Sequence, residues 1–180
     1  ALKWTAMLEG RALVGDGIGA LSFLLRNNVF SDRSTITLAD EIANLQNYVL
    51  ILKLRFGDSF RFEADPAPDT LGCEIPRLIL QPFIENAVFH GIREEAESVL
   101  SVVLTSDRDG DALVIRVSDD GRGFDAVPEA RDRDRFSGIG IPNVQERIRL
   151  WYGDRWGATI TSCPGGGTVV ELRLPAAPEA

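Results

Sequence analysis

The sequence predicts an α/β domain in two layers, with helices covering one face of a mixed, largely antiparallel sheet. Three observations support this fold class. Segments with apolar residues at helical spacing are interspersed with short runs of alternating apolar and polar residues. The pair Asp109-Gly110 joins two of those runs, as in a β-hairpin. The length of 180 residues, with 44% hydrophobic and 26% charged residues, suits one globular domain with a helical appendage.

The N-terminal part, residues 1–57, is expected to form a helical hairpin. Apolar residues recur at helical spacing from about residue 2 to residue 27, but glycines at 15, 17 and 19 weaken that helix by roughly 1 kcal/mol each relative to alanine. A second helix is predicted from Thr37, which can cap it, to about Arg55, before Gly57. Tyr48 belongs to its apolar face. This hairpin either packs on the rest of the domain or forms half of a four-helix dimer bundle.

The next segment combines a strand with a helix. We expect a short strand at 60–63, a loop at 65–69, and a helix from about residue 77 to His90. Pro76 suits the first position of that helix. Pro82 falls inside it and predicts a bend or a late start.

The C-terminal half carries most of the predicted sheet. A charged stretch at 125–137 is expected to be a mobile loop over a ligand site. The regular elements expected here are a hairpin of strands 99–104 and 113–117, a helix at 143–152, and strands at 158–162 and 168–174. Residues 58–176 would thus form the main domain, followed by a tail at 177–180.

Composition limits the classes of function. A formal net charge of −8 disfavours a nucleic-acid partner, which requires a basic face. A triphosphate ligand would require a divalent cation and nearby arginines to offset the repulsion. No apolar run is long enough to cross a bilayer, so we expect no membrane contact by this chain itself. The two cysteines form no metal or disulfide pattern, and a cytoplasmic location is the default expectation, including the cytoplasmic part of a membrane-anchored sensor.

Four blocks in a fixed order carry the chemistry. The first is QPFIENAVFHG at 81–91, and the second is DDGRGF at 119–124, directly after an alternating apolar run. GIGIPN at 138–143 and GGGT at 165–168 follow. Each block alone has a bland structural reading: a turn, a loop hinge, a helix cap or a plain strand residue.

Together, these blocks resemble the N, G1, G2 and G3 boxes of the ATP-binding fold shared by sensor histidine kinases, gyrase-type ATPases, Hsp90 and MutL. The segments TLADEIANLQNYVLILKLRFGD (37–58), IPRLILQPFIENAVFHGI (75–92) and GIGIPNVQERIRL (138–150) are similar to the LytS/YehU-type sensor histidine kinase family. The resemblance covers nearly the whole chain. It implies a Bergerat-type ATP-binding fold, and it favours the dimer-bundle interpretation of the N-terminal hairpin.

The resemblance also implies roles for individual residues around ATP and Mg²⁺. Asn86 matches the asparagine that supplies the metal ligand. Glu85 either polarises the attacking group or orients a metal-bound water. His90 is expected to line the nucleotide pocket, because the family's phosphoacceptor histidine lies in a Pro-His-Phe-type motif expected upstream of Ala1.

The glycine motifs are expected to surround the rest of the nucleotide. Asp119 would accept a hydrogen bond from the adenine amine, which guanine lacks at that position. Gly121 and Gly123 would allow base and sugar to approach. The remaining expected nucleotide-binding residues are Thr168, beside the adenine, and Gly138, Gly140 and Asn143, at a helix start that could hold phosphate.

The chain departs from the family pattern at three positions. Asp120 replaces the usual asparagine, and Ile141 replaces leucine. Phe89 replaces a lysine that often contacts phosphate, which removes a positive charge from the site. The arginines that might compensate for this loss are Arg131, Arg133, Arg135 and Arg147.

The sequence therefore predicts the catalytic ATP-binding region of a two-component sensor histidine kinase. We expect the γ-phosphoryl of ATP to pass to a histidine outside this chain and then to a response regulator, with the full-length protein a homodimer. Two alternatives stay open: a nucleotide-responsive interaction module without kinase activity, and a gyrase- or Hsp90-type ATP hydrolase that uses Glu85 and water.

Overall fold

The computed structural model describes residues 12–29, 34–92, 98–124 and 140–177. The predicted mobile loop at 125–137 and the predicted site residue Gly138 lie outside these ranges. The described elements, in chain order, are α2 (Ala12–Val29), β1 (Thr35–Thr37), α3 (Leu38–Phe56), β2 (Phe60–Pro66), the 3-10 helix η1 (Pro68–Thr70), β3 (Glu74–Pro76), α4 (Gln81–Gly91), β4 (Leu100–Asp109), β5 (Ala112–Asp119), α6 (Gly140–Tyr152), β6 (Gly157–Ser162) and β7 (Thr168–Pro175).

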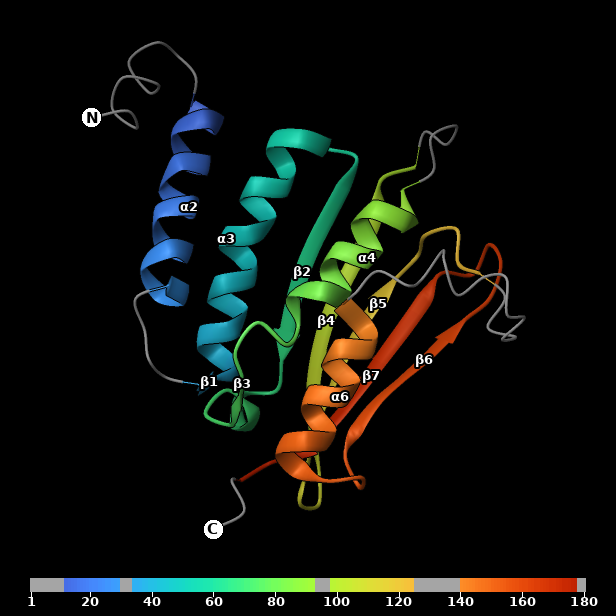
Figure 1. Ribbon diagram of the computed structural model, residues 1–180. Helices are drawn as coiled ribbons and strands as arrows, with labels where there is room; N and C mark the ends of the chain where they lie inside the picture. The colour runs from blue at the N-terminus through green and yellow to red at the C-terminus, as the bar shows by residue number, and fades with distance from the viewer. Residues whose placement is uncertain (1–11, 30–33, 93–97, 125–139, 178–180) are drawn as a thin grey trace.

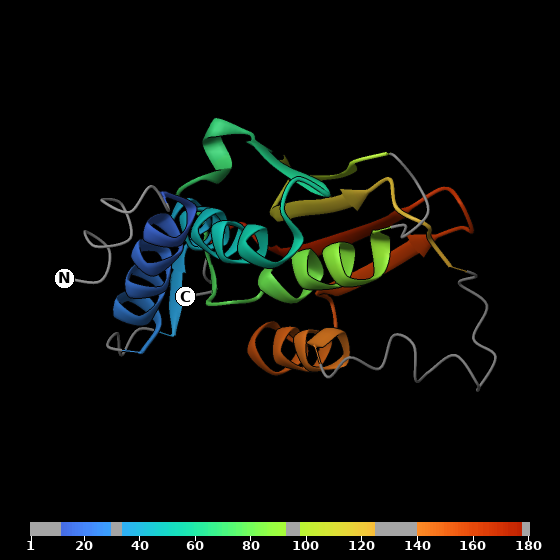
Figure 2. The same ribbon diagram turned by 90° about the horizontal axis from the view of Figure 1, so that it is seen from above.

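A five-stranded sheet in the order β2-β4-β5-β7-β6 forms one layer (Figure 1). Strands β2 and β4 are parallel, and the other neighbouring pairs are antiparallel. Helices α3, α4 and α6 form the second layer on one face of this sheet (Figure 2). The two-layer fold with a mixed, largely antiparallel sheet is therefore as the sequence predicts.

The apolar sides of the two layers meet in one hydrophobic core. Its buried side chains come from all three helices and from most of the strands: Leu38 and Leu45 in α3, Phe83 and Ile84 in α4, Ile148 in α6, and Leu104, Leu113, Ile115 and Leu172 in the strands. The apolar face of α3 thus packs on the sheet domain. Burial of this apolar face stabilises the position of α3 by about 25 cal/mol per Å² of apolar surface removed from water.

Helices α2 and α3 form the predicted antiparallel hairpin (Figure 1). Thr37 caps α3, since its side chain accepts a hydrogen bond from the Asp40 N–H at 3.1 Å, and Gly57 ends the helix with a φ of 57°. The glycines that weaken α2 also have a packing role. A Cβ on Gly17 would collide with the Leu54 side chain of α3, so glycine lets the two helices approach closely.

Two of the boundaries predicted between residues 60 and 90 are wrong. Pro76 does not start a helix but ends strand β3, and α4 begins only at Gln81, with Pro82 in its first turn where a missing N–H is harmless. The loop expected from Asp65 onwards begins later, because β2 continues to Pro66 in parallel pairing with β4. Strand β2 lies at the edge of the sheet, where proline is tolerated.

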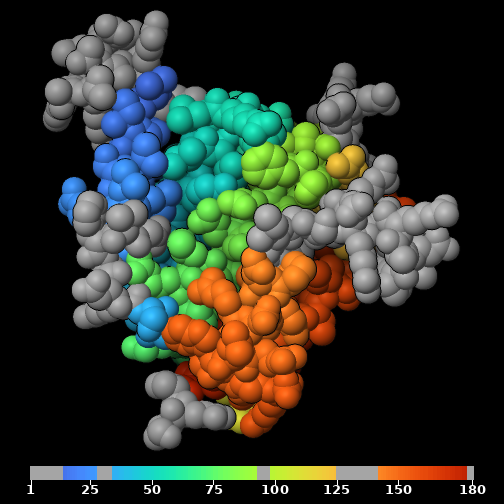
Figure 3. Space-filling model, viewed as in Figure 1, coloured from blue at the N-terminus to red at the C-terminus, as the bar shows by residue number. Residues whose placement is uncertain are grey.

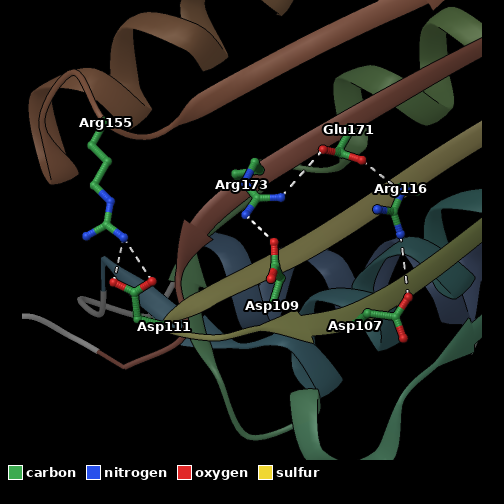
Figure 4. Close-up of polar contacts among 7 residues, drawn as sticks. All are labelled: Asp107, Asp109, Asp111, Arg116, Arg155, Glu171 and Arg173. Carbon is green, nitrogen blue, oxygen red and sulfur yellow. Dashed lines mark hydrogen bonds and ion pairs between the residues drawn. The ribbon is translucent and has the colours of Figure 1, made fainter.

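The face of the sheet opposite the helices is covered by charged side chains. Arg116 bonds Glu171 at 2.9 Å and Asp107 at 3.5 Å, and Arg173 bonds Asp109 at 2.6 Å (Figure 4). These pairs are solvent-exposed, so each contributes little stability.

None of the described helices is long and apolar enough to cross a membrane. Cys73 is buried and Cys163 is exposed, and both are free thiols.

Candidate functional site

The end of β5 and the C-terminus of α4 bring together several of the predicted site residues: His90, Asp119, Gly121, Gly123 and Thr168. Four glycines make this approach possible. A Cβ on Gly121 would meet the Gly91 backbone of α4, and a Cβ on Gly123 would collide with the Cys163 carbonyl in the β6–β7 turn. A Cβ on Gly167 would collide with the Asp119 carbonyl. Gly123 and Gly167 also have positive φ values, of 58° and 77°, which favour glycine.

Asp119 lies at the centre of this junction. Its Oδ1 accepts a hydrogen bond from the Gly121 N–H at 2.9 Å. Burial raises the pKa of the Asp119 carboxyl above its usual value, and the charge of Asp120 adds to this, while hydrogen bonds from Gly121 and Thr168 oppose it. The site therefore holds a desolvated acceptor, which a complementary donor would stabilise.

Thr168 lies next to Asp119 across the ladder, because β5 and β7 pair in the register Asp119↔Thr168. Its hydroxyl is 3.0 Å from the Ser162 hydroxyl, which also donates to the Gly167 carbonyl at 2.9 Å. Ser162 further accepts a hydrogen bond from the Phe124 N–H at 3.0 Å. Sequence reasoning did not identify Ser162, since a serine in a strand gives no signal of this role.

Helix α4 contributes Asn86 and His90, which are four residues apart and so share a face. Asn86 is half-buried, and among the described residues its amide has no hydrogen-bond partner. Burial, and secondly the Arg122 guanidinium, lower the pKa of His90 below its usual value, so its imidazole is neutral at pH 7. The Arg122 Nε donates to the His90 carbonyl at 2.5 Å, which ties the glycine motif to the end of α4.

Glu85 is oriented by two neighbouring side chains that sequence reasoning missed. The Tyr48 hydroxyl of α3 donates to Glu85 Oε1 at 2.7 Å, and Gln81 Nε2 donates to the same oxygen at 2.8 Å. The available signal was a tyrosine on an otherwise apolar helix face, because a buried tyrosine hydroxyl usually requires a partner.

The start of α6 differs from the expected arrangement. Gly140 is the first residue of the helix, whereas the sequence placed it ahead of a helix beginning at Asn143. Asn143 is exposed on the first turn of α6, and no described contact joins it to Asp119 or Asn86. Helix α6 lies next to α4 on the helical face (Figure 3).

The structure also shows the surroundings of the substituted positions. Phe89 packs edge-on against Phe56 with ring centroids 5.2 Å apart, and the Arg55 guanidinium lies 5.3 Å from the Phe89 ring centroid. Arg147, one of the arginines expected to compensate for the missing lysine, donates a hydrogen bond to the Arg77 carbonyl at 2.8 Å, in the loop before α4. Arg131, Arg133 and Arg135 lie outside the described residues.

Asp120, the third departure, has a structural partner. Its Oδ1 accepts a hydrogen bond from the Ser101 N–H at 2.7 Å, and its own N–H donates to the Ser101 carbonyl at 3.2 Å. An asparagine oxygen could accept the same bond, so Asp120 fixes the turn to β4 as its usual counterpart would.

An Asn amide oxygen suits Mg²⁺, which prefers oxygen ligands and keeps several waters and phosphate contacts. The unpartnered, half-buried amide of Asn86 fits this requirement. Among the described residues, no group of three or more His, Cys, Asp or Glu side chains could hold a metal ion by itself. Any magnesium bound here would therefore depend on nucleotide phosphates for most of its anionic ligands.

Comparison with known families agrees with this geometry. The family described as "Histidine kinase-, DNA gyrase B-, and HSP90-like ATPase" matches residues 74–178, and the family "Histidine kinase" matches residues 1–60. The chain therefore belongs to the histidine kinase-, DNA gyrase B- and HSP90-like ATPase family. Within it, the chain is similar to sensor histidine kinases, which confirms the resemblance found in the sequence.

Two curated relatives illustrate this similarity. Sensor histidine kinase YesM of Bacillus subtilis (strain 168) is 27% identical over 97% of this chain and 30% of its own length. Sensor histidine kinase BtsS of Escherichia coli (strain K12) is 30% identical over 86% of this chain and 26% of its own length. The chain thus spans less than a third of these relatives.

Solved structures confirm the fold. The histidine kinase domain of the blue-light activated histidine kinase EL346 from Erythrobacter litoralis superimposes with a TM-score of 0.61 at 19% identity, covering 97% of this chain and 81% of that one. The catalytic domain of histidine kinase ThkA gives a TM-score of 0.58 at 16% identity, covering 82% and 98%.

Proposed function

We propose that this chain is the ATP-binding catalytic region of a two-component sensor histidine kinase, binding ATP with Mg²⁺ between α4, the turn after β5 and the start of α6. The observation that carries the proposal is the half-buried Asp119 carboxylate, which accepts a hydrogen bond from the Gly121 N–H where Gly121 lies against the Gly91 backbone. The family match supports the same assignment.

Asp119 would recognise the adenine base. Its carboxylate accepts a hydrogen bond from the exocyclic amine, whereas guanine presents a carbonyl oxygen there and leaves the buried charge unpaired. Thr168 and Ser162 would support the base through their hydroxyls, with or without a bridging water. Gly121 and Gly123 leave room for the base and sugar because they carry no Cβ.

Asn86 would hold the magnesium ion, which neutralises charge on the phosphates. His90, being neutral, can donate or accept a hydrogen bond at the edge of the pocket without adding charge. Backbone N–H groups at the start of α6, near Gly140 and Asn143, would contact the phosphates, and we propose the same ligand for Gly138.

The reaction would transfer the γ-phosphoryl from ATP to an imidazole nitrogen, so that the bond to the β-phosphate oxygen breaks and ADP leaves. The accepting histidine lies outside this chain in our proposal, and a response regulator would then receive the phosphoryl group. Glu85 would polarise the attacking group or orient a metal-bound water. We assign the protein to the cytoplasm, where ATP and such regulators meet.

The N-terminal hairpin would supply a dimer contact. Val14, Ile18, Leu21 and Leu25 are spaced four, three and four residues apart, which is the spacing of a coiled-coil seam. Leu21 and Leu25 are 50% and 48% exposed. Helix α2 lies at one end of the helical layer, with α3 on its inner side (Figure 2), so the exposed part of this apolar stripe is available to a second copy of the chain.

A second candidate function is a nucleotide-responsive interaction module without kinase activity. The observation that favours it is Phe89, which packs on Phe56 where a lysine would contact phosphate. The ATP hydrolase alternative ranks third, because two donors already hold Glu85 Oε1.

Nucleotide titration tests the proposal. ATP with Mg²⁺ should raise the melting temperature, because a ligand at a hundred times its dissociation constant adds about 2.7 kcal/mol to the free energy of unfolding. GTP should cause no such rise. Acid-labile phosphate formed from ATP by the full-length protein separates the kinase from the interaction module. A folded protein with no shift at millimolar ATP contradicts both functions.

A further inference from the structure

Three polar side chains lie on the side of helix α3 that packs against the rest of the domain, among residues that are otherwise apolar. Glu41, Asn44 and Tyr48 lie three and four residues apart, so they share one side of the helix. Glu41 is fully buried, and Asn44 is 5% exposed with an Oδ1 that has no hydrogen-bond partner among the described residues. Polar groups buried in a helix contact are destabilising unless hydrogen bonds satisfy them, as they do for Glu41 and Tyr48.

Glu41 links α3 to the segment that precedes α4. Its two carboxylate oxygens accept hydrogen bonds from the N–H groups of Leu78 at 3.0 Å and Leu80 at 3.1 Å. Leu78 has a φ of 55°, an unfavourable conformation for a residue with a Cβ. The buried carboxylate thus holds a strained segment in place and determines where α4 begins.

Tyr48 links α3 to the middle of α4. Its hydroxyl reaches Glu85 Oε1 at 2.7 Å, and Gln81 reaches the same oxygen at 2.8 Å from one helical turn earlier. Among the described residues, Glu85 Oε2 has no hydrogen-bond partner. Two donors on one oxygen restrict the rotation of the Glu85 side chain and leave the other oxygen for a ligand.

The Tyr48 hydroxyl keeps its proton and so remains a hydrogen-bond donor. Burial raises its pKa far above the usual value, and the hydrogen bond and charge of Glu85 act in the same direction. The phenol therefore stays protonated at any physiological pH. A phenylalanine at this position would keep the ring packing and remove only the donor.

We infer that Tyr48 is a positioning residue for Glu85: from α3, it fixes the acid next to Asn86 in the orientation that phosphoryl transfer uses. This inference rests on the proposed function, because Tyr48 would act only through Glu85. It implies that a displacement of α3 changes the rate of transfer without changing the adenine site, because Asp119 and its hydrogen-bond partners Gly121 and Thr168 do not lie on α3.

The first test is Tyr48→Phe in the full-length protein. Formation of acid-labile phosphate from ATP should slow by roughly 10- to 100-fold, the effect of misplacing a reacting group, whereas the dissociation constant for ATP with Mg²⁺ should stay within about twofold. Tyr152→Phe is the matched control, since Tyr152 is the other half-buried tyrosine of the described chain and lies on α6. It should change neither quantity.

A double-mutant cycle separates positioning from general structural support. Glu85→Gln should itself slow transfer, and adding Tyr48→Phe should slow it no further, because no reactive acid remains to be positioned. Gln81→Ala, which removes the second donor, should also slow transfer and keeps the test valid if Tyr48→Phe folds poorly.

Three results would overturn the inference. These are an unchanged rate in Tyr48→Phe, an equal slowing by Tyr48→Phe in the presence and absence of Glu85, and an unchanged rate in Glu85→Gln. Each of them leaves ATP binding intact and so spares the proposed ATP site. Failure of the wild-type protein to bind ATP would instead remove the proposed function and this inference with it.

Discussion

The folded protein disfavours the ionised form of the Asp119 side chain. Burial raises the pKa of its carboxyl, so the folded protein binds the proton more tightly than the unfolded chain does. The stability linked to this group is therefore present at low pH and is lost as the pH rises through the pKa of the folded state. A residue kept in this condition is more readily explained by ligand recognition than by stability.

The substitution Asp119→Asn should therefore separate stability from binding. We expect a higher melting temperature at pH 7, since the amide keeps an acceptor for Gly121 without the buried charge, and a smaller gain at acidic pH. ATP affinity should fall about 10- to 100-fold, the value of a hydrogen bond to a charged group. Thermal melts at several pH values and ATP titrations measure both. A lower melting temperature with unchanged ATP affinity would contradict this account of Asp119.

The substitution Gly121→Ala tests whether the turn after β5 lies as close to α4 as the structure indicates. In Gly121→Ala, the new Cβ would meet the Gly91 backbone, which cannot move aside like a flexible side chain. We expect a loss of about 1–3 kcal/mol in the free energy of unfolding, as for other overpacked sites. The control is Gly72→Ala, where a Cβ meets nothing within 4 Å. Equal effects of the two variants in urea melts would argue against a backbone contact at Gly121.

At the scale of elements, the sequence predicts helices and strands well where the apolar period and the end signals agree. Helix α3 is an example, with Thr37 and Gly57 at its ends and a regular apolar face between them. Strands β4 and β5 are another, because Gly110 turns with a φ of 62° between two alternating runs. Helix and hairpin periodicities are local properties, so a single sequence reveals them.

The start of α4 could not be predicted in this way. Pro76 is a good first residue of a helix, but it pairs with Thr35 in the β1–β3 ladder, and Glu41 then holds the backbone at Leu78 and Leu80. These partners are 35 or more residues distant in the sequence. The same reason explains why Tyr48 was missed at Glu85, whereas Asp119 and Gly121 could be identified from a contiguous motif.

Glu41→Gln tests whether α3 determines where α4 begins. One carboxylate oxygen becomes an NH₂ group, which faces a backbone N–H and leaves a buried donor unpaired. We expect a loss of about 1–3 kcal/mol in the free energy of unfolding. Glu63→Gln, at an exposed position of β2, should change stability by less than about 0.5 kcal/mol. Denaturant melts of both variants provide the comparison, and equal stabilities would contradict a role for Glu41.

At the scale of the whole molecule, the two faces of the sheet differ. One face carries exposed ion pairs (Figure 4). The other face packs against the helices and carries the core and the proposed site. The acidic residues of the charged face are largely matched by arginines, as in the pairs of Asp107 with Arg116 and Asp109 with Arg173. The formal charge of −8 acts on a ligand mainly at short range, since exposed charges beyond about 10 Å are largely screened by salt. Local charges and a bound cation would therefore determine whether a triphosphate binds on the helical face.

The apolar stripe of α2 predicts self-association. Replacing Leu21 and Leu25 together by glutamate should shift the full-length protein from dimer towards monomer, because charges in a coiled-coil seam repel and lose apolar contact. Sedimentation velocity measures this shift. Ser22→Glu, on a neighbouring exposed position of the same helix, serves as control. A full-length wild-type protein that is monomeric at all concentrations would contradict the predicted dimer.

The most direct measurement is a crystal structure of the protein with a non-hydrolysable ATP analogue and Mg²⁺. The account predicts that the adenine amine lies within hydrogen-bond distance of an Asp119 carboxylate oxygen, and that the Asn86 side-chain oxygen coordinates the metal below the phosphates. A nucleotide bound elsewhere, or bound with Asp119 and Asn86 on different sides of it and in contact with neither base nor metal, would contradict it.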